Sequence, residues 1–222
     1  MKVLALCGSV AAAVRQWGVL RSSPGLDLRF LVFGTSPWYQ ARHTGVANLV
    51  PAARLAIAGR LRVTRHPLDQ PQTLGWIRRA APDVGLHVSG TIYRRPVIDC
   101  FRLGILNPHI GMLPSFRGRS VMEWSILEGH PTGVTVFFLD EGIDTGPDIV
   151  LRREVPLRGH RDVRSAKEHL FALDAAMFAE ALALLQRPGF RPIRNDGSGR
   201  RFYVMSRLFT GVVDAALRAA ES

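Results

Sequence analysis

Two short stretches of this sequence hold residue types that do chemistry, and the first contains Asn107 and His109. The two residues flank Pro108 at the end of an apolar segment. An amide NH₂ can donate to a developing oxyanion, and an imidazole can donate there or move a proton near neutral pH. The same pair also occurs as an ordinary polar pair at a strand end, so it decides nothing by itself.

The second stretch, Asp140 to Gly146, is acidic and interrupted by glycines. It lacks the twelve-residue ligand spacing of a calcium loop, and an ordinary polar turn is the alternative. Its glycines permit tight backbone curvature, so that amides and carbonyls can approach a planar ligand. Asp144 can then orient His109, as carboxylates orient histidine in acyl-transfer sites. We therefore expect the two stretches to meet in one active site.

The elements before these stretches alternate between apolar strands and helical segments. The predicted strands include 2–7, 28–33, 84–88 and 104–106. Such alternation favours an α/β fold of the Rossmann-like type, an open, mostly parallel sheet with helices on both faces. Ligands in these folds sit beyond the carboxyl ends of strands, where Asn107 and the loop 89–93 are expected.

The second half of the chain predicts a more mixed pattern. Ser120 and Glu123 have the spacing of a helix capping box, residues 134–139 read as a central strand, and 148–155 as a strand near an edge. Residues 162–185 predict one long helix. We expect a catalytic domain over 1–187 and a short C-terminal extension over 188–222 that packs on the same domain.

The composition is that of a globular protein and indicates neither a disordered chain nor a fibrous repeat. The chain has 222 residues, 47% of them hydrophobic, which suits a globular domain with a substantial core. The first residues read as a strand and a helix and not as a signal peptide. Cys7 and Cys100 show neither metal-ligand spacing nor a disulfide framework, so a reducing cytoplasm is the expected location.

The net charge of +11 raises the question of nucleic-acid binding. Nearly all basic residues are arginines, since only Lys2 and Lys167 are lysines. The arginines are scattered along the chain and not interleaved with aromatic residues. We therefore do not expect a nucleic-acid or membrane partner, while a small anionic substrate stays compatible with the charge.

Taken together, the motifs resemble the folate-dependent N-formyltransferase family, which includes glycinamide ribonucleotide, methionyl-tRNA and sugar-amine enzymes. The resemblance rests on an ordered set of motifs between Pro82 and Ile149. They are Asn107-Pro108-His109, Leu113-Pro114, Arg117-Gly118, Gly133-Val134-Thr135-Val136 and Asp140 to Gly146. The order of the motifs is far more specific than any single one.

The resemblance implies roles for particular residues. The catalytic set of the family falls on Asn107, His109 and Asp144. Its folate-binding set falls on Ile92, Tyr93 and Arg94, and on Leu139, Asp140, Glu141, Gly142 and Asp144. The Leu113–Pro114 bond matches a position that is often cis in the family. The implied co-substrate is 10-formyltetrahydrofolate, and no metal is implied.

The acceptor amine is the open question. Gly8 to Ala13 lacks the polar glycine-rich loop of the glycinamide ribonucleotide enzymes, and the methionyl-tRNA enzymes continue into a β-barrel domain for which we expect no room after Ser222. We therefore favour a nucleotide-linked amino sugar or another specialised metabolite. A carrier-bound aminoacyl group, glycinamide ribonucleotide, and a non-catalytic folate- or nucleic-acid-binding module remain alternatives.

Candidate acceptor contacts lie outside the motifs. They are Trp38, Tyr39, Trp124, Arg117 and Arg119, with a core contact favoured for Trp124 and a solvated loop as the alternative for the two arginines. An apolar strip near the C-terminus, formed by Leu208, Val212, Val213 and Leu217, fits either a core or a homodimer interface.

Overall fold

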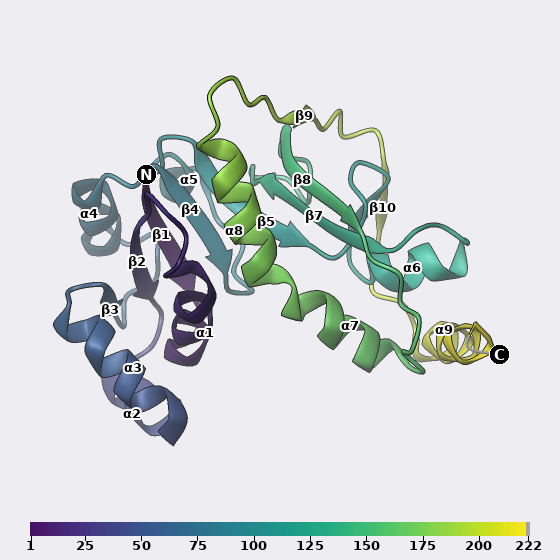
Figure 1. The fold of residues 1–222 in the computed structure, drawn as a ribbon, viewed down its shortest axis with the longest axis horizontal. Coiled ribbons are helices and arrows are strands. Elements are labelled where there is room, and N and C mark those ends of the chain that lie inside the picture. Colours follow the sequence, from purple (N-terminus) through teal and green to yellow (C-terminus); the bar gives the residue numbers. More distant parts are fainter. Residues whose placement is uncertain (221–222) are drawn as a thin grey trace. The chain divides into compact units, whose positions relative to one another are not determined.

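The computed structural model describes residues 1–220 and divides the chain into two compact units (Figure 1). The first unit is Met1–Asn107 and the second is Pro108–Ser222. Glu221 and Ser222, the end of the predicted extension, lie outside the described residues.

The first unit is a parallel sheet with the strand order β3-β2-β1-β4-β5. Its strands are β1 (Lys2–Cys7), β2 (Asp27–Val32), β3 (Leu61–Val63), β4 (Val84–Val88) and β5 (Gly104–His109), the last of which runs on into the second unit. Its helices are α1 (Val10–Leu20), α2 (Pro37–His43), α3 (Val46–Ile57), α4 (Pro71–Ala80) and α5 (Arg95–Ile98).

The core of the first unit is built on β1, which pairs with β2 on one side and β4 on the other. Residues Val3 to Cys7 are all buried, as expected for a central parallel strand that is covered on both faces. The parallel pairing confirms the predicted α/β class. Residues 37–43 form the short helix α2, which Ser36 caps by accepting from the N–H of Tyr39.

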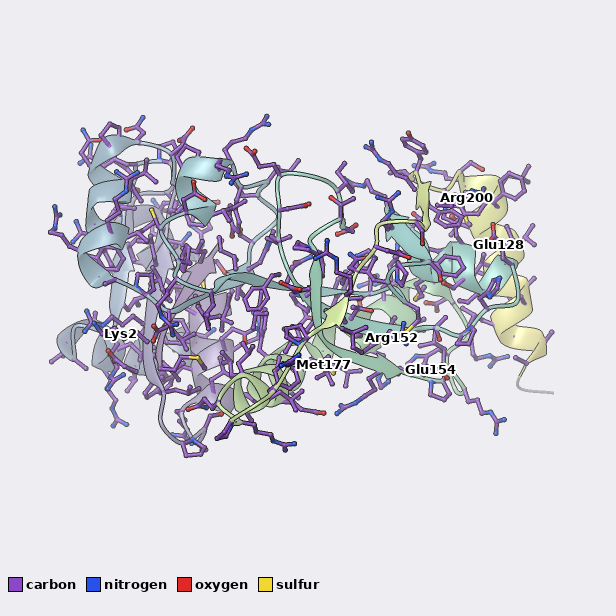
Figure 2. The ribbon with its side chains drawn as sticks, turned by 90° about the horizontal axis from the view of Figure 1, so that it is seen from above. Lys2, Glu128, Arg152, Glu154, Met177 and Arg200 are labelled. Carbon is purple, nitrogen blue, oxygen red and sulfur yellow. The ribbon has the colours of Figure 1, made fainter. Side chains whose placement is uncertain are left out.

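In its described residues, the second unit combines an antiparallel group of strands, a parallel strand pair and four helices. Strands β7 (Gly133–Phe138), β8 (Asp148–Glu154) and β9 (Ile193–Arg194) pair antiparallel, whereas β6 (Phe116–Gly118) pairs parallel with β10 (Arg200–Phe202). Its helices are α6 (Val121–Leu127), α7 (Val163–Ala172), α8 (Asp174–Leu185) and α9 (Arg207–Ala219). An ion pair between Arg200 and Glu128 joins β10 to the end of α6 (Figure 2).

Two local predictions in this unit are wrong, and a third is confirmed. The helix predicted over 162–185 is two helices, because the last turn of α7 tightens, with the Leu173 N–H donating to the Leu170 carbonyl, and Asp174 opens α8. Strand β8 lies near an edge as predicted, since its neighbour β9 is the last strand in the order and pairs only with its first residues. The capping box is absent: Ser120 accepts from the Met205 N–H instead, at 3.2 Å.

The C-terminal segment packs on the second unit through β9, β10 and α9. Its apolar strip is divided: Val213 and Leu217 are buried, whereas Leu208 and Val212 are exposed. Val213 and Leu217 therefore belong to the core. An interface between two copies of the chain through Leu208 and Val212 stays a prediction. The predicted boundary at residue 187 likewise stays a prediction.

A buried carboxyl at the start of α8 predicts a pH-dependent stability. Burial raises the pKa of Asp174 to about 7, and its Oδ1 has no hydrogen-bond partner among residues 1–220. Since the folded state holds this proton more tightly than the unfolded state, the contribution of Asp174 to stability is greatest below about pH 4 and is lost as the pH rises through about 7. Each tenfold difference in proton affinity between the two states contributes at most about 1.4 kcal/mol.

The measurement is urea unfolding of the parent and of Asp174→Asn at pH 5 and pH 8. We expect the substitution to raise the free energy of unfolding more at pH 8 than at pH 5. An equal effect at the two pH values would contradict a buried, protonated Asp174.

Candidate active site

The imidazole of His109 is held in a buried position within the second unit. Its Nε2 lies 2.8 Å from the Phe116 carbonyl oxygen, and since a carbonyl only accepts, Nε2 carries the proton. Its Nδ1 lies 3.5 Å from Asp144 Oδ2. The side chains are 7% and 13% exposed, so water screens this pair weakly. The structure thus brings together two of the three predicted catalytic residues.

Asp144 lies in the loop between β7 and β8, in a backbone conformation that residues other than glycine adopt uncommonly. Its φ of 54° is in the left-handed region, which costs energy for a residue other than glycine. Its Oδ2 also accepts the Gly118 N–H at 2.9 Å. One carboxylate oxygen therefore faces both a backbone donor and the His109 ring.

The loop is shaped by its glycines and by Asp140. A Cβ on Gly146 would lie 1.7 Å from the Phe138 carbonyl oxygen, and one on Gly142 would lie 1.9 Å from Thr145 Oγ1. The Asp140 carboxylate accepts from the Gly142 N–H at 3.0 Å and from the Thr145 hydroxyl at 2.9 Å. These contacts require glycine at both positions and give the acidic turn a defined shape.

Asn195, which the sequence pattern places in a plain turn, also holds this loop. It is 4% exposed, and its Nδ2 donates to the Gly146 carbonyl at 2.8 Å and, more weakly, to the Asp144 carbonyl at 3.4 Å. The signal in the sequence was weak, because an asparagine before Asp-Gly suggests only a turn. Its role depends on a contact across fifty residues of chain.

Asn107 is the last residue of the first unit and belongs to β5, which extends further than predicted, to His109. Side chains alternate along a strand, so residues 107 and 109 share one side of it. Pro108 between them has no N–H to donate to a neighbouring strand. Gly111 makes room for the imidazole, since a Cβ there would lie 2.7 Å from His109 Nε2.

The predicted folate-binding residues of the first unit differ in exposure. Tyr93 is buried, its hydroxyl lies 3.0 Å from Ser89 Oγ, and burial raises the pKa of the phenol. Ile92, by contrast, is 73% exposed, and Arg94 is exposed too. Tyr93 thus anchors the loop, while its two neighbours stay accessible to a ligand.

The other predicted folate-binding residues lie together in the second unit. Leu139, Asp140 and Asp144 are partly buried, whereas Glu141 and Gly142 are exposed at the tip of the loop. Leu139 packs against the small cluster that contains Leu113. The Leu113–Pro114 peptide bond is cis, which confirms that prediction.

The candidate acceptor contacts have separate environments. The Arg117 Nε donates to the Gly199 carbonyl at 2.8 Å, whereas the Arg119 side chain is exposed. Trp124 stacks on Phe202, and its Nε1 donates to the Tyr203 carbonyl at 2.9 Å, which confirms the core contact. Trp38 and Tyr39 are exposed residues of the first unit.

Neither a cluster of metal ligands nor a membrane-crossing helix occurs within residues 1–220. In that range no three or more His, Cys, Asp and Glu side chains gather in a way that would hold a metal ion. The helices of the same range are too short or too polar to cross a membrane.

Comparison with known proteins gives consistent results. The model of the family described as formyl transferase matches residues 30–182. The methionyl-tRNA formyltransferase of Citrifermentans bemidjiense is 31% identical over 146 residues, which cover 65% of this chain and 46% of that protein. The chain therefore spans about half the length of the curated relatives it matches.

Solved structures share the fold at low identity. A sugar N-formyltransferase from a Shewanella species has a TM-score of 0.63 at 16% identity, with 98% of this chain and 87% of that one covered. A formyltransferase from Anoxybacillus kamchatkensis, solved with UDP-4,6-dideoxy-4-formamido-L-AltNAc and tetrahydrofolate, has a TM-score of 0.59 at 19% identity over the whole of both chains. The family match over more than half of the sequence, with this shared fold, shows that the chain belongs to the formyl transferase family.

Proposed function

We propose that this protein transfers a formyl group from 10-formyltetrahydrofolate to a primary amine. The observation that carries the proposal is the buried His109–Asp144 pair, with its 3.5 Å separation, in a loop that is shaped by glycines. Asn107, two residues before the histidine on the same strand, completes the catalytic set. Family membership supports the same reaction.

The chemistry follows from which atoms are free to act. Because the Nε2 proton of His109 is engaged by the Phe116 carbonyl, Nδ1 is the ring atom left to face the substrate, and Asp144 lies beside it. As the amine nitrogen attacks the formyl carbon, the Asn107 amide and a protonated His109 donate to the oxyanion. When the bond from carbon to N10 breaks, the proton released by the amine passes to N10, with Asp144 assisting directly or through water.

The loop 139–144 suits the flat, hydrogen-bonding ring of a folate. Glu141 and Gly142 are exposed at its tip, and a side chain at 142 would collide with Thr145. A glycine at that point lets a planar ring approach the backbone closely. Ile92, Tyr93 and Arg94 of the first unit stay predicted folate-binding residues.

For the acceptor we propose a primary amine on an anionic molecule, with a nucleotide-linked amino sugar as the first candidate. The net charge of +11 favours an anionic acceptor. Methionyl-tRNA is a second candidate, because it is the substrate in the names of the curated relatives at about 31% identity. The expectation that no nucleic acid is involved, and the expected cytoplasmic location, stay predictions.

The test is incubation with 10-formyltetrahydrofolate and a panel of acceptors: UDP-linked amino sugars, glycinamide ribonucleotide and methionyl-tRNA. Formylated products are followed by mass and tetrahydrofolate by absorbance. We expect turnover with an amino sugar nucleotide or with methionyl-tRNA. If no acceptor is formylated and the folate does not bind, formyl transfer is wrong.

Asn195 gives a prediction within this function, since it holds the backbone of the loop that carries Asp144. Asn195→Ala removes both hydrogen bonds from its Nδ2 and leaves buried carbonyls without a donor. We expect kcat to fall about ten- to hundredfold, because small displacements of catalytic groups are costly. The measurement is kcat and KM for the folate, together with the pH profile of kcat.

The matched control is Asn48→Ala. The Nδ2 of Asn48 also donates to a backbone carbonyl, that of Thr44 at 2.9 Å, but in the first unit. If the two variants lose the same small fraction of activity, Asn195 does not position the catalytic loop.

A further inference from the structure

A pocket in the first unit contains none of the proposed catalytic or folate-binding residues. It has a volume of about 490 Å³ and opens between α1 and α3. Trp17, Gly18 and Arg21 line it from one side, and Arg54 and Leu55 from the other. This volume is within the range that binds small molecules.

The residues that line the pocket lie on the facing surfaces of the two helices. Val14, Gly18 and Arg21 recur at helical spacing on α1 and its cap, and Pro51, Leu55 and Ala58 do so on α3 and its cap. A Cβ on Gly18 would meet no atom within 4 Å. This glycine is therefore not required by packing, although glycine weakens a helix interior.

The charge at the pocket is positive, with two arginines unpaired. No ion pair or side-chain hydrogen bond joins Arg21 or Arg54 to another of residues 1–220. Arg60 is engaged, since its Nη1 donates to the Leu28 carbonyl at 3.0 Å and lies 3.4 Å from Asp27 Oδ1. Two guanidinium groups thus remain to bind an anion.

A simpler account is that these arginines neutralise the carboxyl ends of the two helices. Each helix end carries about half a negative charge, and Asp27 adds one. The two helix ends and Asp27 together carry about two negative charges. The three positive charges of Arg21, Arg54 and Arg60 exceed them by about one. The helix ends therefore do not account for all of the charge.

The pocket also holds an aromatic surface. Trp17 lines it, the Arg60 guanidinium lies 5.7 Å from the centre of the indole, and Phe30 contacts the ring edge-on. The indole and the stems of the arginines offer apolar contact to a flat ring, while the guanidinium groups suit a phosphate.

The site is distinct from the proposed catalytic residues of the same unit. Arg60 contacts Asp27 and Leu28, at the start of β2. Tyr93 follows the carboxyl end of β4, and Asn107 lies near the carboxyl end of β5. Since the strands are parallel, the pocket lies at the opposite end of this sheet.

We propose that the pocket between α1 and α3 binds a small anion with a flat ring, of the nucleoside monophosphate class. Arg21 and Arg54 pair with the phosphate, and the base lies against Trp17 and the wall formed by Leu55. The site takes no part in formyl transfer and needs none of the catalytic residues.

The test is calorimetric titration of the full chain with AMP and UMP, with adenosine, uridine and inorganic phosphate as partial ligands. We expect at least one nucleotide to bind with a Kd below about 1 mM, and its nucleoside and phosphate at least about tenfold more weakly. Gly18→Leu fills the pocket and Arg54→Gln removes one charge, so each weakens binding about tenfold or more.

Controls separate this site from the catalytic one. Arg42 occupies the last turn of α2 as Arg54 does that of α3, so Arg42→Gln matches the loss of charge, and it leaves binding unchanged. His109→Ala leaves it unchanged too. We expect Gly18→Leu to have a thermal midpoint at least as high as the parent's, since leucine favours a helix and its Cβ meets no atom within 4 Å.

The proposal is overturned if neither nucleotide binds at millimolar concentration, or if binding survives Gly18→Leu. Binding that is lost in His109→Ala but kept in Arg54→Gln overturns it as well, because the nucleotide then occupies the catalytic site. None of these results depends on whether formyl transfer is observed.

Discussion

Asp144→Asn is expected to lower turnover by a factor of about 10² to 10⁴ while the fold stays intact. The asparagine keeps the shape of the side chain, and its carbonyl oxygen can still accept the Gly118 N–H that Asp144 accepts at 2.9 Å. What it loses is the negative charge beside His109 Nδ1 and the ability to take a proton. The measurement is kcat for formyl transfer, with circular dichroism and the thermal midpoint to check the fold.

His109→Ala tests the same pair from the other side, with a loss of similar size expected because the donor to the oxyanion disappears. The matched control is Glu168→Gln, which removes an exposed carboxylate on α7 and is expected to leave kcat unchanged. Near-normal turnover in Asp144→Asn or His109→Ala would remove the catalytic assignment, even if the protein proved to be a formyltransferase.

Lys167→Met is expected to destabilise the protein by about 3 kcal/mol or more. Lys167 Nζ lies 2.5 Å from Glu123 Oε1, and the Glu123 side chain is only 3% exposed. The other carboxylate oxygen, Oε2, is buried without a hydrogen-bond partner among the described residues. Without the lysine, this carboxylate is buried without its counter-charge, at a cost far above that of losing a surface ion pair.

The measurement is urea and thermal unfolding at pH 7. For a chain of this size, about 3 kcal/mol corresponds to a fall in the thermal midpoint of about 6–12 °C. The double variant Glu123→Leu with Lys167→Met should recover most of the loss, because no charge is then buried. An unchanged midpoint in Lys167→Met would mean that the carboxylate finds another partner or water.

The sequence by itself was sufficient for the features that depend on local pattern. The buried strands of the first unit read as apolar runs, since a strand covered on both faces has no polar side. The residues of the candidate site were also readable, because Asn107, His109 and Asp144 stand within motifs whose order is specific. Their catalytic roles await the variants above.

Other features depended on contacts that local pattern does not carry. Ser120 and Glu123 have a capping-box spacing, yet Ser120 bonds to Met205 and Glu123 to Lys167, both far along the chain. A hydrogen bond or ion pair offered by the tertiary structure replaced the local one, which is worth only about 1 kcal/mol. The long helix predicted over 162–185 divides for a related reason, as Asp174 favours a helix start over a helix interior.

The tertiary structure alone decided how the candidate loop is held and where the pocket between α1 and α3 lies. Asn195 reaches Gly146 from 49 residues away, and Gly18 faces α3 across a gap that neither helix reveals in its own sequence. Side-chain type and spacing determine which residues can do chemistry, because reactivity belongs to the residue. Which backbone each side chain supports is decided only when distant segments pack, because that geometry belongs to the whole fold.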